Sequence, residues 1–127
     1  MINLGLAGTT FQSVLIENSL VMTFSDVHFA VIQSPLTIES QGEKHLLSPE
    51  NDADEAFAPV RELIGQTVKS AIAEETGALR IVFSNGAIIA VPPDEAYEAW
   101  NVSGPNGALV VSMPGGELAI WSPAEGG

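Results

Sequence analysis

The chain contains no cysteine and very few basic residues, and each shortage excludes a class of site. Without cysteine there is no disulfide framework, no thiolate-ligated zinc site and no thiol nucleophile. Only 4 lysine and arginine residues stand against 16 aspartate and glutamate residues, so the formal net charge is -12. Because phosphate binding depends on lysine and arginine, we expect neither nucleic acid nor an anionic membrane as a partner.

Membrane-spanning and secretory segments are missing as well. No apolar run approaches the ~18 residues that a membrane-spanning helix requires. No basic residue precedes Lys44, whereas a secretory signal begins with a positively charged region. We therefore expect a cytoplasmic protein.

The few charges of the chain nearly all have one sign. Charged residues make up 16% of the sequence, against about 25% in a typical globular protein. The sequence is therefore that of an apolar domain and not of a disordered acidic segment, and its length fits a single domain, residues 1–127. The one-sided charge favours a basic protein as partner, although it also serves to keep an apolar domain soluble.

The strongest signal in the sequence is an internal repeat. The segment from Leu6 to Glu17 recurs as Leu63 to Glu74, with leucine, glycine, threonine, serine and glutamate at the same relative positions. The match then resumes, because Leu20 to Asp26 aligns with Leu79 to Asn85. Self-similarity of this kind indicates that one structural unit is built twice.

The repeat predicts the architecture of the chain. Two β-rich units at residues 6–35 and 63–93, followed by a third hairpin at residues 108–122, are expected to form an antiparallel sheet or sandwich. The predicted fold class is mainly β or α+β, with one or two short helices. Residues 123–127 are expected to form a frayed tail.

Short runs rich in β-branched and aromatic residues, separated by turn residues, predict the individual strands. Asn85-Gly86 lies between two such runs and predicts a type I′ hairpin turn, in which both central residues adopt a positive φ. The expected strands are residues 11–17, 20–24, 29–32, 36–39, 67–73, 79–83, 87–91, 109–113 and 117–121.

Two segments carry helical signals instead. Residues 48–64 combine an acidic beginning with several apolar residues, and residues 94–100 place Tyr97 and Trp100 on one face of a short helix. Residues 41–55 are expected to form a long, mobile loop.

The search for catalytic motifs is negative. The sequence has no nucleophile elbow, no phosphate-binding glycine loop and no metalloprotease histidine pair. Its two histidines, His28 and His45, have no serine and acid placed around them as a triad requires. We therefore expect neither an enzyme nor a bound cofactor.

The acidic run at residues 51–55 invites comparison with a calcium-binding loop. With Asp52 as the first ligand, the sixth position is Phe57 instead of glycine and the twelfth is Leu63 instead of glutamate. We therefore expect no metal site and interpret the run as a solvated loop.

Acidic and aromatic residues remain as candidates for binding a partner. A paired-carboxylate site for glycoside chemistry could use Glu95, Glu98 and Glu117, but their spacing does not single them out. The simpler interpretation of Trp100 and Trp121 is that both anchor the core. The alternative is that one is partly exposed beside these acids, where arginine could stack and pair. The candidate partner-binding residues are Glu50, Asp52, Asp54, Glu55, Glu95, Glu98, Trp100 and Glu117.

Three short motifs in the second half of the chain follow one another in a distinctive order. They are Phe83-Ser-Asn-Gly86, then Glu98-Ala-Trp100, then Pro114-Gly-Gly-Glu-Leu118 with a tryptophan three residues on. Together they resemble a family of small, uncharacterised actinobacterial proteins, over roughly residues 60–122. The first copy of the repeat departs from this pattern, because Val27 stands where glycine is expected. The resemblance implies no activity, so no catalytic residues are carried over.

Three functions fit these observations. The first is a non-enzymatic protein-binding domain, and specifically an immunity protein that neutralises a basic toxin through an acidic surface. The second is a small-ligand-binding or enzymatic domain with a pocket between the repeats. The third is a homo-oligomeric structural module, such as a homodimer joined through an edge strand.

Overall fold

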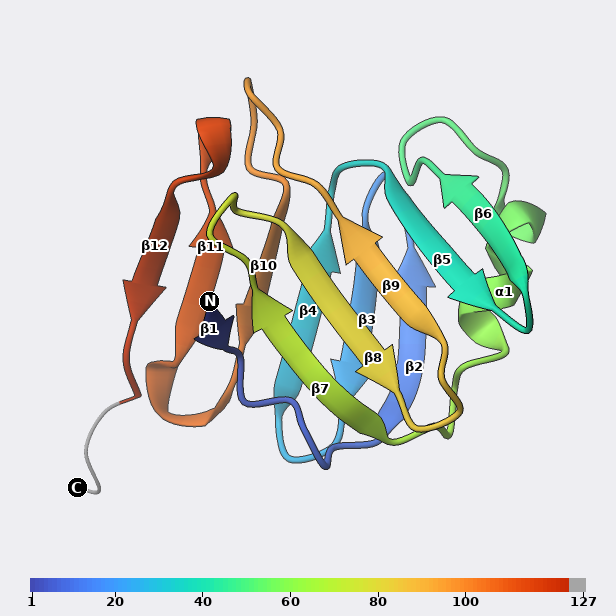
Figure 1. Ribbon diagram of the computed structural model, residues 1–127, viewed down its shortest axis with the longest axis horizontal. Helices are drawn as coiled ribbons and strands as arrows, with labels where there is room; N and C mark the ends of the chain where they lie inside the picture. Colours follow the sequence, from blue (N-terminus) through green and yellow to red (C-terminus); the bar gives the residue numbers. More distant parts are fainter. Residues whose placement is uncertain (124–127) are drawn as a thin grey trace.

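The computed structural model describes residues 1–123, which form two antiparallel six-stranded sheets packed face to face (Figure 1). The predicted fold class is thus confirmed. The first sheet has the order β1 (Ile2–Asn3), β7 (Val68–Ala73), β8 (Leu79–Phe83), β9 (Ile88–Val91), β5 (Leu36–Ser40) and β6 (Glu43–Leu47). The second sheet has the order β12 (Leu118–Trp121), β11 (Leu109–Ser112), β10 (Trp100–Ser103), β4 (His28–Ile32), β3 (Leu20–Phe24) and β2 (Phe11–Ile16). Of the predicted frayed tail, residues 124–127 lie outside the described residues.

The core lies between the two sheets, because alternate residues of each strand point inward. In β3, the first, third and fifth residues are buried and the two between them are half-buried. Aromatic rings from both sheets meet in this core. The ring centroid of Phe11 lies 5.4 Å from that of Phe24 and 6.1 Å from that of Phe83.

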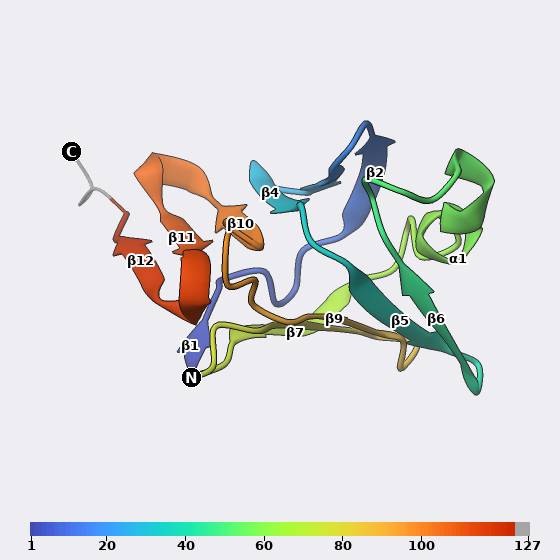
Figure 2. The same cartoon turned by 90° about the horizontal axis from the view of Figure 1, so that it is seen from above.

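A short helical segment lies at one end of the sandwich, beyond β2 and β6 (Figure 2). The 3-10 helix Asp54–Phe57 runs directly into α1 (Ala58–Arg61). The short helix predicted within residues 48–64 is therefore present. A turn in which the Ser48 N–H donates to Asp52 Oδ2 (2.7 Å) occupies the start of that range and competes with helix formation. The buried apolar side chains of this segment are Phe57, Val60 and Leu63.

The two copies of the sequence repeat form the same three-stranded meander, one in each sheet. β2, β3 and β4 belong to the first copy, and β7, β8 and β9 to the second. The irregularity within the meander is repeated too. The pairing register shifts between Phe11 and Ser13 in β2, and between the equivalent residues Val68 and Ser70 in β7. Because such a bulge increases the local twist, both copies bend at the same place.

The two copies meet in a symmetric set of backbone hydrogen bonds around an isolated bridge between Thr10 and Thr67. The N–H donors and carbonyl acceptors are Gly8 to Val68 (2.9 Å), Gly65 to Phe11 (2.8 Å), Phe11 to Gln66 (3.0 Å) and Val68 to Thr9 (2.8 Å). The repeat relates these hydrogen bonds in pairs: the bond from Gly8 to Val68 corresponds to that from Gly65 to Phe11, and the bond from Phe11 to Gln66 corresponds to that from Val68 to Thr9. A pseudo-twofold axis therefore passes through the bridge.

After its meander, each copy sends its next strands into the opposite sheet. β5 follows β4 in the chain but pairs with β9, and β10 follows β9 but pairs with β4. β6 then pairs with β5, and β11 with β10. Short 3-10 turns at Pro105–Gly107 and Pro114–Gly116 lead into β11 and β12, which form the predicted third hairpin. The halves of the chain are thereby interlocked, since each sheet contains strands from both.

The segment before β10 bends at residues 95–97 and contains no helix, whereas a helix was expected over residues 94–100. Asp94 does cap a turn, because its Oδ1 accepts two backbone N–H groups at 2.8 and 3.0 Å. The turn does not continue into a helix because Ala99 is held between two other segments. Its N–H donates to Ser112 O (3.1 Å) and its carbonyl accepts the N–H of Gln33 (2.9 Å). Tertiary pairing has overridden the local helical preference.

The expected long loop at residues 41–55 contains a strand instead. β6 pairs with β5 along its whole length, and Gln41 and Gly42 between the two strands both have a positive φ (54° and 80°). This is the two-residue hairpin geometry that was expected at Asn85-Gly86. In that hairpin only Gly86 has a positive φ (90°). The prediction therefore placed the type I′ turn in the wrong hairpin.

One buried carbonyl ties the two sheets together at the end opposite the helix. Gly77 O, in the β7–β8 turn, accepts the indole Nε1–H of Trp100 (2.9 Å) and the hydroxyl of Ser112 (2.8 Å). The backbone approaches closely at the same place. A Cβ on Gly77 would lie 2.4 Å from Gly116 O, and a Cβ on Gly116 would lie 2.2 Å from Thr76 O. Only glycine leaves room for this contact.

The two hairpin turns of the repeat give a matched test of backbone strain. Val27 has a φ of 61°, a conformation that costs a β-branched residue about 1–2 kcal/mol, whereas the equivalent Gly86 adopts φ 90° freely. Val27→Gly should raise the free energy of unfolding by about 0.5–1 kcal/mol, after the entropy loss of glycine is subtracted. Gly86→Val should lower it by about 1–2 kcal/mol. Urea denaturation measures the free energy of unfolding of both variants. A Val27→Gly protein that is less stable than the parent would show that the positive φ of Val27 is not strained.

The glycine contact between the sheets gives a second test. Gly116→Ala places a methyl group against backbone as well as a side chain at positive φ, so it should lower the free energy of unfolding by about 3 kcal/mol. Gly115→Ala is the control. Gly115 also has a positive φ (84°) but its Cβ would meet nothing within 4 Å, so the expected loss is about 1 kcal/mol. Equal losses in thermal or urea unfolding would argue against the close contact.

Candidate functional site

Acidic side chains from separate parts of the chain meet around one hollow of about 520 Å³ on the surface. We call it the acidic hollow. Glu17 comes from the β2–β3 turn, Glu50 from the turn after β6, and Tyr97 and Glu98 from the connection between β9 and β10. Its complete lining is Glu17, Asn18, Ser19, Gln33, Glu50, Tyr97 and Glu98. The fold therefore joins members of the two acidic clusters that lie far apart in the sequence.

Local hydrogen bonds hold the segments that surround the acidic hollow. The β2–β3 turn is closed by a bond from Glu17 N–H to Ser19 O (3.0 Å), with Asn18 at a positive φ of 57°. Asparagine tolerates this left-handed conformation better than most residues. The β9–β10 connection is anchored beside it, because the Ala99 carbonyl accepts the N–H of Gln33. The glutamates thus extend from backbone that is fixed by pairing.

The acidic hollow has no counter-charge of its own among the described residues. Glu17, Glu50 and Glu98 are exposed, and no lysine or arginine belongs to the lining. The ion pairs found in residues 1–123 lie elsewhere: Lys44 with Glu39, His45 with Glu43, and Arg61 with Asp54. Three neighbouring carboxylates without a cation favour a positively charged ligand. The exposed ring of Tyr97 adds a surface on which a guanidinium can stack.

The remaining acidic candidates take other positions. Asp52 accepts a backbone hydrogen bond in its own turn, and Asp54 is paired with Arg61 at 2.8 Å. Glu55 and Glu95 are exposed but do not line the hollow. Glu117 follows the Pro114–Gly116 turn, and its backbone carbonyl is bonded within the β11–β12 hairpin. The geometry therefore brings together only Glu50 and Glu98 of the predicted acids.

Trp100 cannot contribute a surface aromatic ring, because its side chain is fully buried and its indole is bonded to Gly77 O. This corrects its placement among the candidate partner-binding residues. The predicted helix would have put Tyr97 and Trp100 on one face, but they lie in opposite environments, and Tyr97 is 74% exposed. Of the two tryptophans only Trp100 anchors the core, since Trp121 is 53% exposed.

Sequence reasoning missed Glu17 and Tyr97 as members of the site. Glu17 lies in the best-matched part of the repeat, where it served as evidence of duplication. Its nearness to Glu50 and Glu98 depends on the exchange of strands between the sheets, which no local pattern encodes. The signal for Tyr97 was present but misread, because an exposed aromatic ring in a turn and a packed one in a helix look alike in sequence.

An apolar groove of about 450 Å³ lies between the N-terminal segment and the last three strands of the second sheet. It contains side chains from Ile2, Leu4, Val110 and Ile120, and Ile120 is 52% exposed although its register places it on the inner side of the sheet. His28 lies at its border, where its Nδ1 is 3.1 Å from Ser25 O. No aspartate, glutamate, lysine or arginine among the described residues lines this groove.

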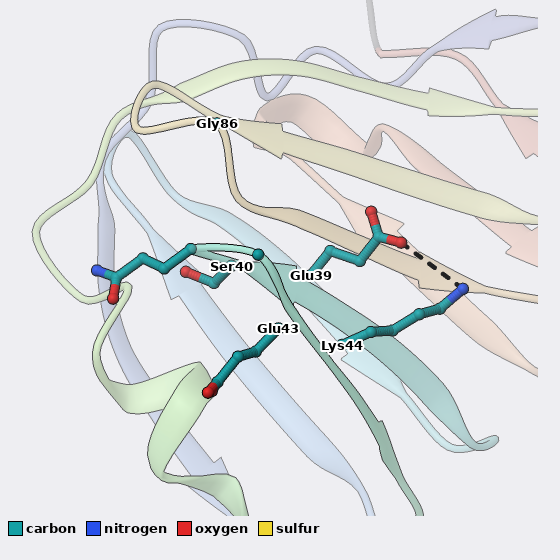
Figure 3. Close-up of a pocket in the computed structure, with 7 residues that line it drawn as sticks. Glu39, Ser40, Glu43, Lys44 and Gly86 are labelled. Carbon is teal, nitrogen blue, oxygen red and sulfur yellow. Dashed lines mark ion pairs between the residues drawn. The ribbon is translucent and has the colours of Figure 1, made fainter.

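A third hollow, of about 320 Å³, lies where the β5–β6 turn approaches Gly86 of the β8–β9 turn (Figure 3). Its one ion pair, Lys44 Nζ to Glu39 Oε1 at 3.6 Å, is formed by two exposed side chains. Such a pair contributes little to stability. The hollow offers no convergent set of polar groups and is the weakest of the three as a site.

Within residues 1–123, no group of three or more histidine, aspartate or glutamate side chains is arranged to hold a metal ion. In the same range, no helix has the length and apolar character needed to cross a membrane.

Comparison with known proteins identifies the family of the chain but no activity. Neither the curated proteins nor the solved structures with which the chain was compared gave a significant match. A family model described as a family of unknown function (DUF6188) matches residues 2–122. Because this match spans almost the whole chain, the protein belongs to the DUF6188 family.

Proposed function

We propose that this protein is a non-enzymatic, protein-binding domain that binds a basic partner through the acidic hollow. One observation carries the proposal: Glu17, Glu50 and Glu98 line one hollow together with an exposed tyrosine, and the lining contains no lysine or arginine. An arginine side chain suits such a place, because its guanidinium can pair with a carboxylate and stack on an aromatic ring together. The net charge of -12 would steer a basic partner towards this surface.

The specific form of the proposal is an immunity protein. A small, strongly acidic cytoplasmic protein without catalytic motifs would neutralise a basic toxin by covering its active site. An inhibitor of this kind needs an interface of about 1,600 Å² in total, so the acidic hollow would form only part of it. The neighbouring Asp52, Glu55 and Glu95 are exposed and belong to the same proposal as charges at the rim of the contact.

Charge neutralisation with a matched control tests this proposal. The hollow variant carries Glu17→Gln, Glu50→Gln and Glu98→Gln. The control carries Asp26→Asn, Glu62→Gln and Glu117→Gln, which remove the same charge from exposed positions outside the hollow. Immobilised parent, hollow variant and control would capture proteins from an actinobacterial lysate, since the sequence motifs resemble those of actinobacterial proteins. The captured basic protein would then be purified and its affinity measured by calorimetry.

The parent and the control should bind the same basic protein with similar affinity. The hollow variant should bind it at least about tenfold more weakly, which corresponds to about 1.4 kcal/mol. About 0.5 M salt shortens the range of electrostatic attraction to a few Å. It should therefore also weaken the complex of the parent protein with the basic protein. Equal binding by all three proteins would refute the proposal, and protection of cells from the captured protein would support the immunity form.

The apolar groove favours a second candidate function, the binding of a small uncharged molecule. Its volume of about 450 Å³ and its apolar lining match those of ligand sites in other proteins. Nile red, a neutral apolar dye, is a suitable probe. Ala108→Phe would fill the groove, and Ala96→Phe at an exposed alanine is the control. Dye fluorescence should rise with the parent and the control but not with Ala108→Phe, whereas an equal rise in all three would exclude the groove.

A further inference from the structure

The strands of the two sheets differ sharply in charge. The six strands of the first sheet contain five charged residues: Glu39, Glu43, Lys44, Lys69 and Arg80. The six strands of the second sheet contain no aspartate, glutamate, lysine or arginine at all. Among the described residues, the aspartates and glutamates near the second sheet all lie in turns and connections between strands. A protein with a net charge of -12 thus keeps one whole sheet free of charge.

The outer side of the second sheet carries no charged residue and is mostly apolar, and we call it the uncharged face. Pairing register places its residues in two rows across the strands, alternating with residues that face the core. One row is Leu15, Val21, Val31, Asn101, Val111 and Ala119. The other is Ser13, Thr23, Phe29, Ser103, Leu109 and Trp121.

Large apolar side chains on the uncharged face are open to solvent. Leu15 is 56% exposed, Phe29 37% and Trp121 53%. Val111 is buried by its neighbours although it does not belong to the core between the sheets. Seen from above, the short helix lies beside β2 and does not cover this side of the sheet (Figure 2). Extended apolar surfaces of this kind indicate an interaction site.

We propose that the uncharged face is the interface between two copies of this chain. Two molecules of charge -12 repel each other, and any contact that brings their acids together is costly. The uncharged face is the surface on which two copies can meet without opposing carboxylates. It is also self-complementary in composition, as a twofold interface requires, because uncharged and mostly apolar rows on one copy meet the same rows on the other. The proposal is independent of the basic partner and goes beyond it.

The size of the face sets the strength of the dimer. Six strands spaced about 4.8 Å apart, each with about four residues in the sheet, give a surface about 29 Å wide and about 15 Å long. Two such surfaces packed as aligned sheets would bury on the order of 1,000 Å², near the lower limit of a specific interface. The dimer is therefore weak and depends on protein concentration.

Salt separates this proposal from the binding of a basic partner. Added salt screens the repulsion between two acidic copies, so it should strengthen the dimer. The same salt should weaken a complex that the acidic hollow forms with a basic protein. The dimer and the complex with a basic protein are therefore expected to depend on salt in opposite directions, so either proposal can be refuted without the other.

The internal repeat supplies a matched pair of variants for the test. Phe29→Glu places a carboxylate on the uncharged face, and Ile88→Glu places one at the equivalent position on the outer side of the first sheet. Both variants have the same net charge. Sedimentation equilibrium should give a dissociation constant that Phe29→Glu raises at least about tenfold and that Ile88→Glu raises much less. Thermal unfolding would confirm that both variants are folded.

A milder variant keeps the test decisive if Phe29→Glu does not fold. Asn101→Asp replaces a side-chain amide by a carboxylate at the centre of the uncharged face, where Asn101 pairs with Val31 and Val111. It should weaken the dimer in the same direction and more so at low salt. The proposal is overturned if the parent is monomeric up to millimolar concentration, if Ile88→Glu dissociates the dimer as much as Phe29→Glu, or if salt weakens the dimer.

Discussion

The fold depends on the backbone crossing at Thr10 and Thr67, where the two copies of the repeat pair with each other. The hydrogen bonds on either side of this bridge belong to main-chain groups, so the crossing is insensitive to side-chain identity. It fixes the two meanders back to back and places the following strands within reach of the opposite sheet. The aromatic cluster of Phe11, Phe24 and Phe83 lies between the meanders that it joins.

The motifs that link the chain to its family have a structural explanation at the other end of the sandwich. Trp100 donates to Gly77 O, and Gly116 allows the β7–β8 turn to approach the turn before β12. Both contacts join the sheets beside the third hairpin, whose last strand, β12, has no counterpart in the first copy. Trp100 and Gly116 therefore hold the fold together, whereas Glu98 of the same motifs lies on the surface in the acidic hollow.

Residue patterns predicted the strands of both meanders, β5 and the third hairpin, because alternation and turn residues are local properties, but they did not predict β1, β6 or β10. The equivalence of β2–β4 and β7–β9 followed from sequence identity alone. The sequence did not predict which segments that are distant in the chain pair with each other. Ala99 is not helical because its backbone pairs with Gln33 and Ser112, and β6 forms because β5 is beside it. The acidic hollow was only half predicted for the same reason, since Glu17 shares a hollow with Glu50 and Glu98 because strands are exchanged between the sheets and not because of any spacing in the chain.

The longer connection between β9 and β10, compared with that between β4 and β5, has a consequence for valency. A perfectly duplicated sandwich would present every surface feature twice, related by the pseudo-twofold axis. Tyr97 and Glu98 belong to the longer connection, and the shorter one has no residues to match them. The arrangement of Glu17, Glu50, Tyr97 and Glu98 around one hollow therefore has no exact copy in the other half of the chain.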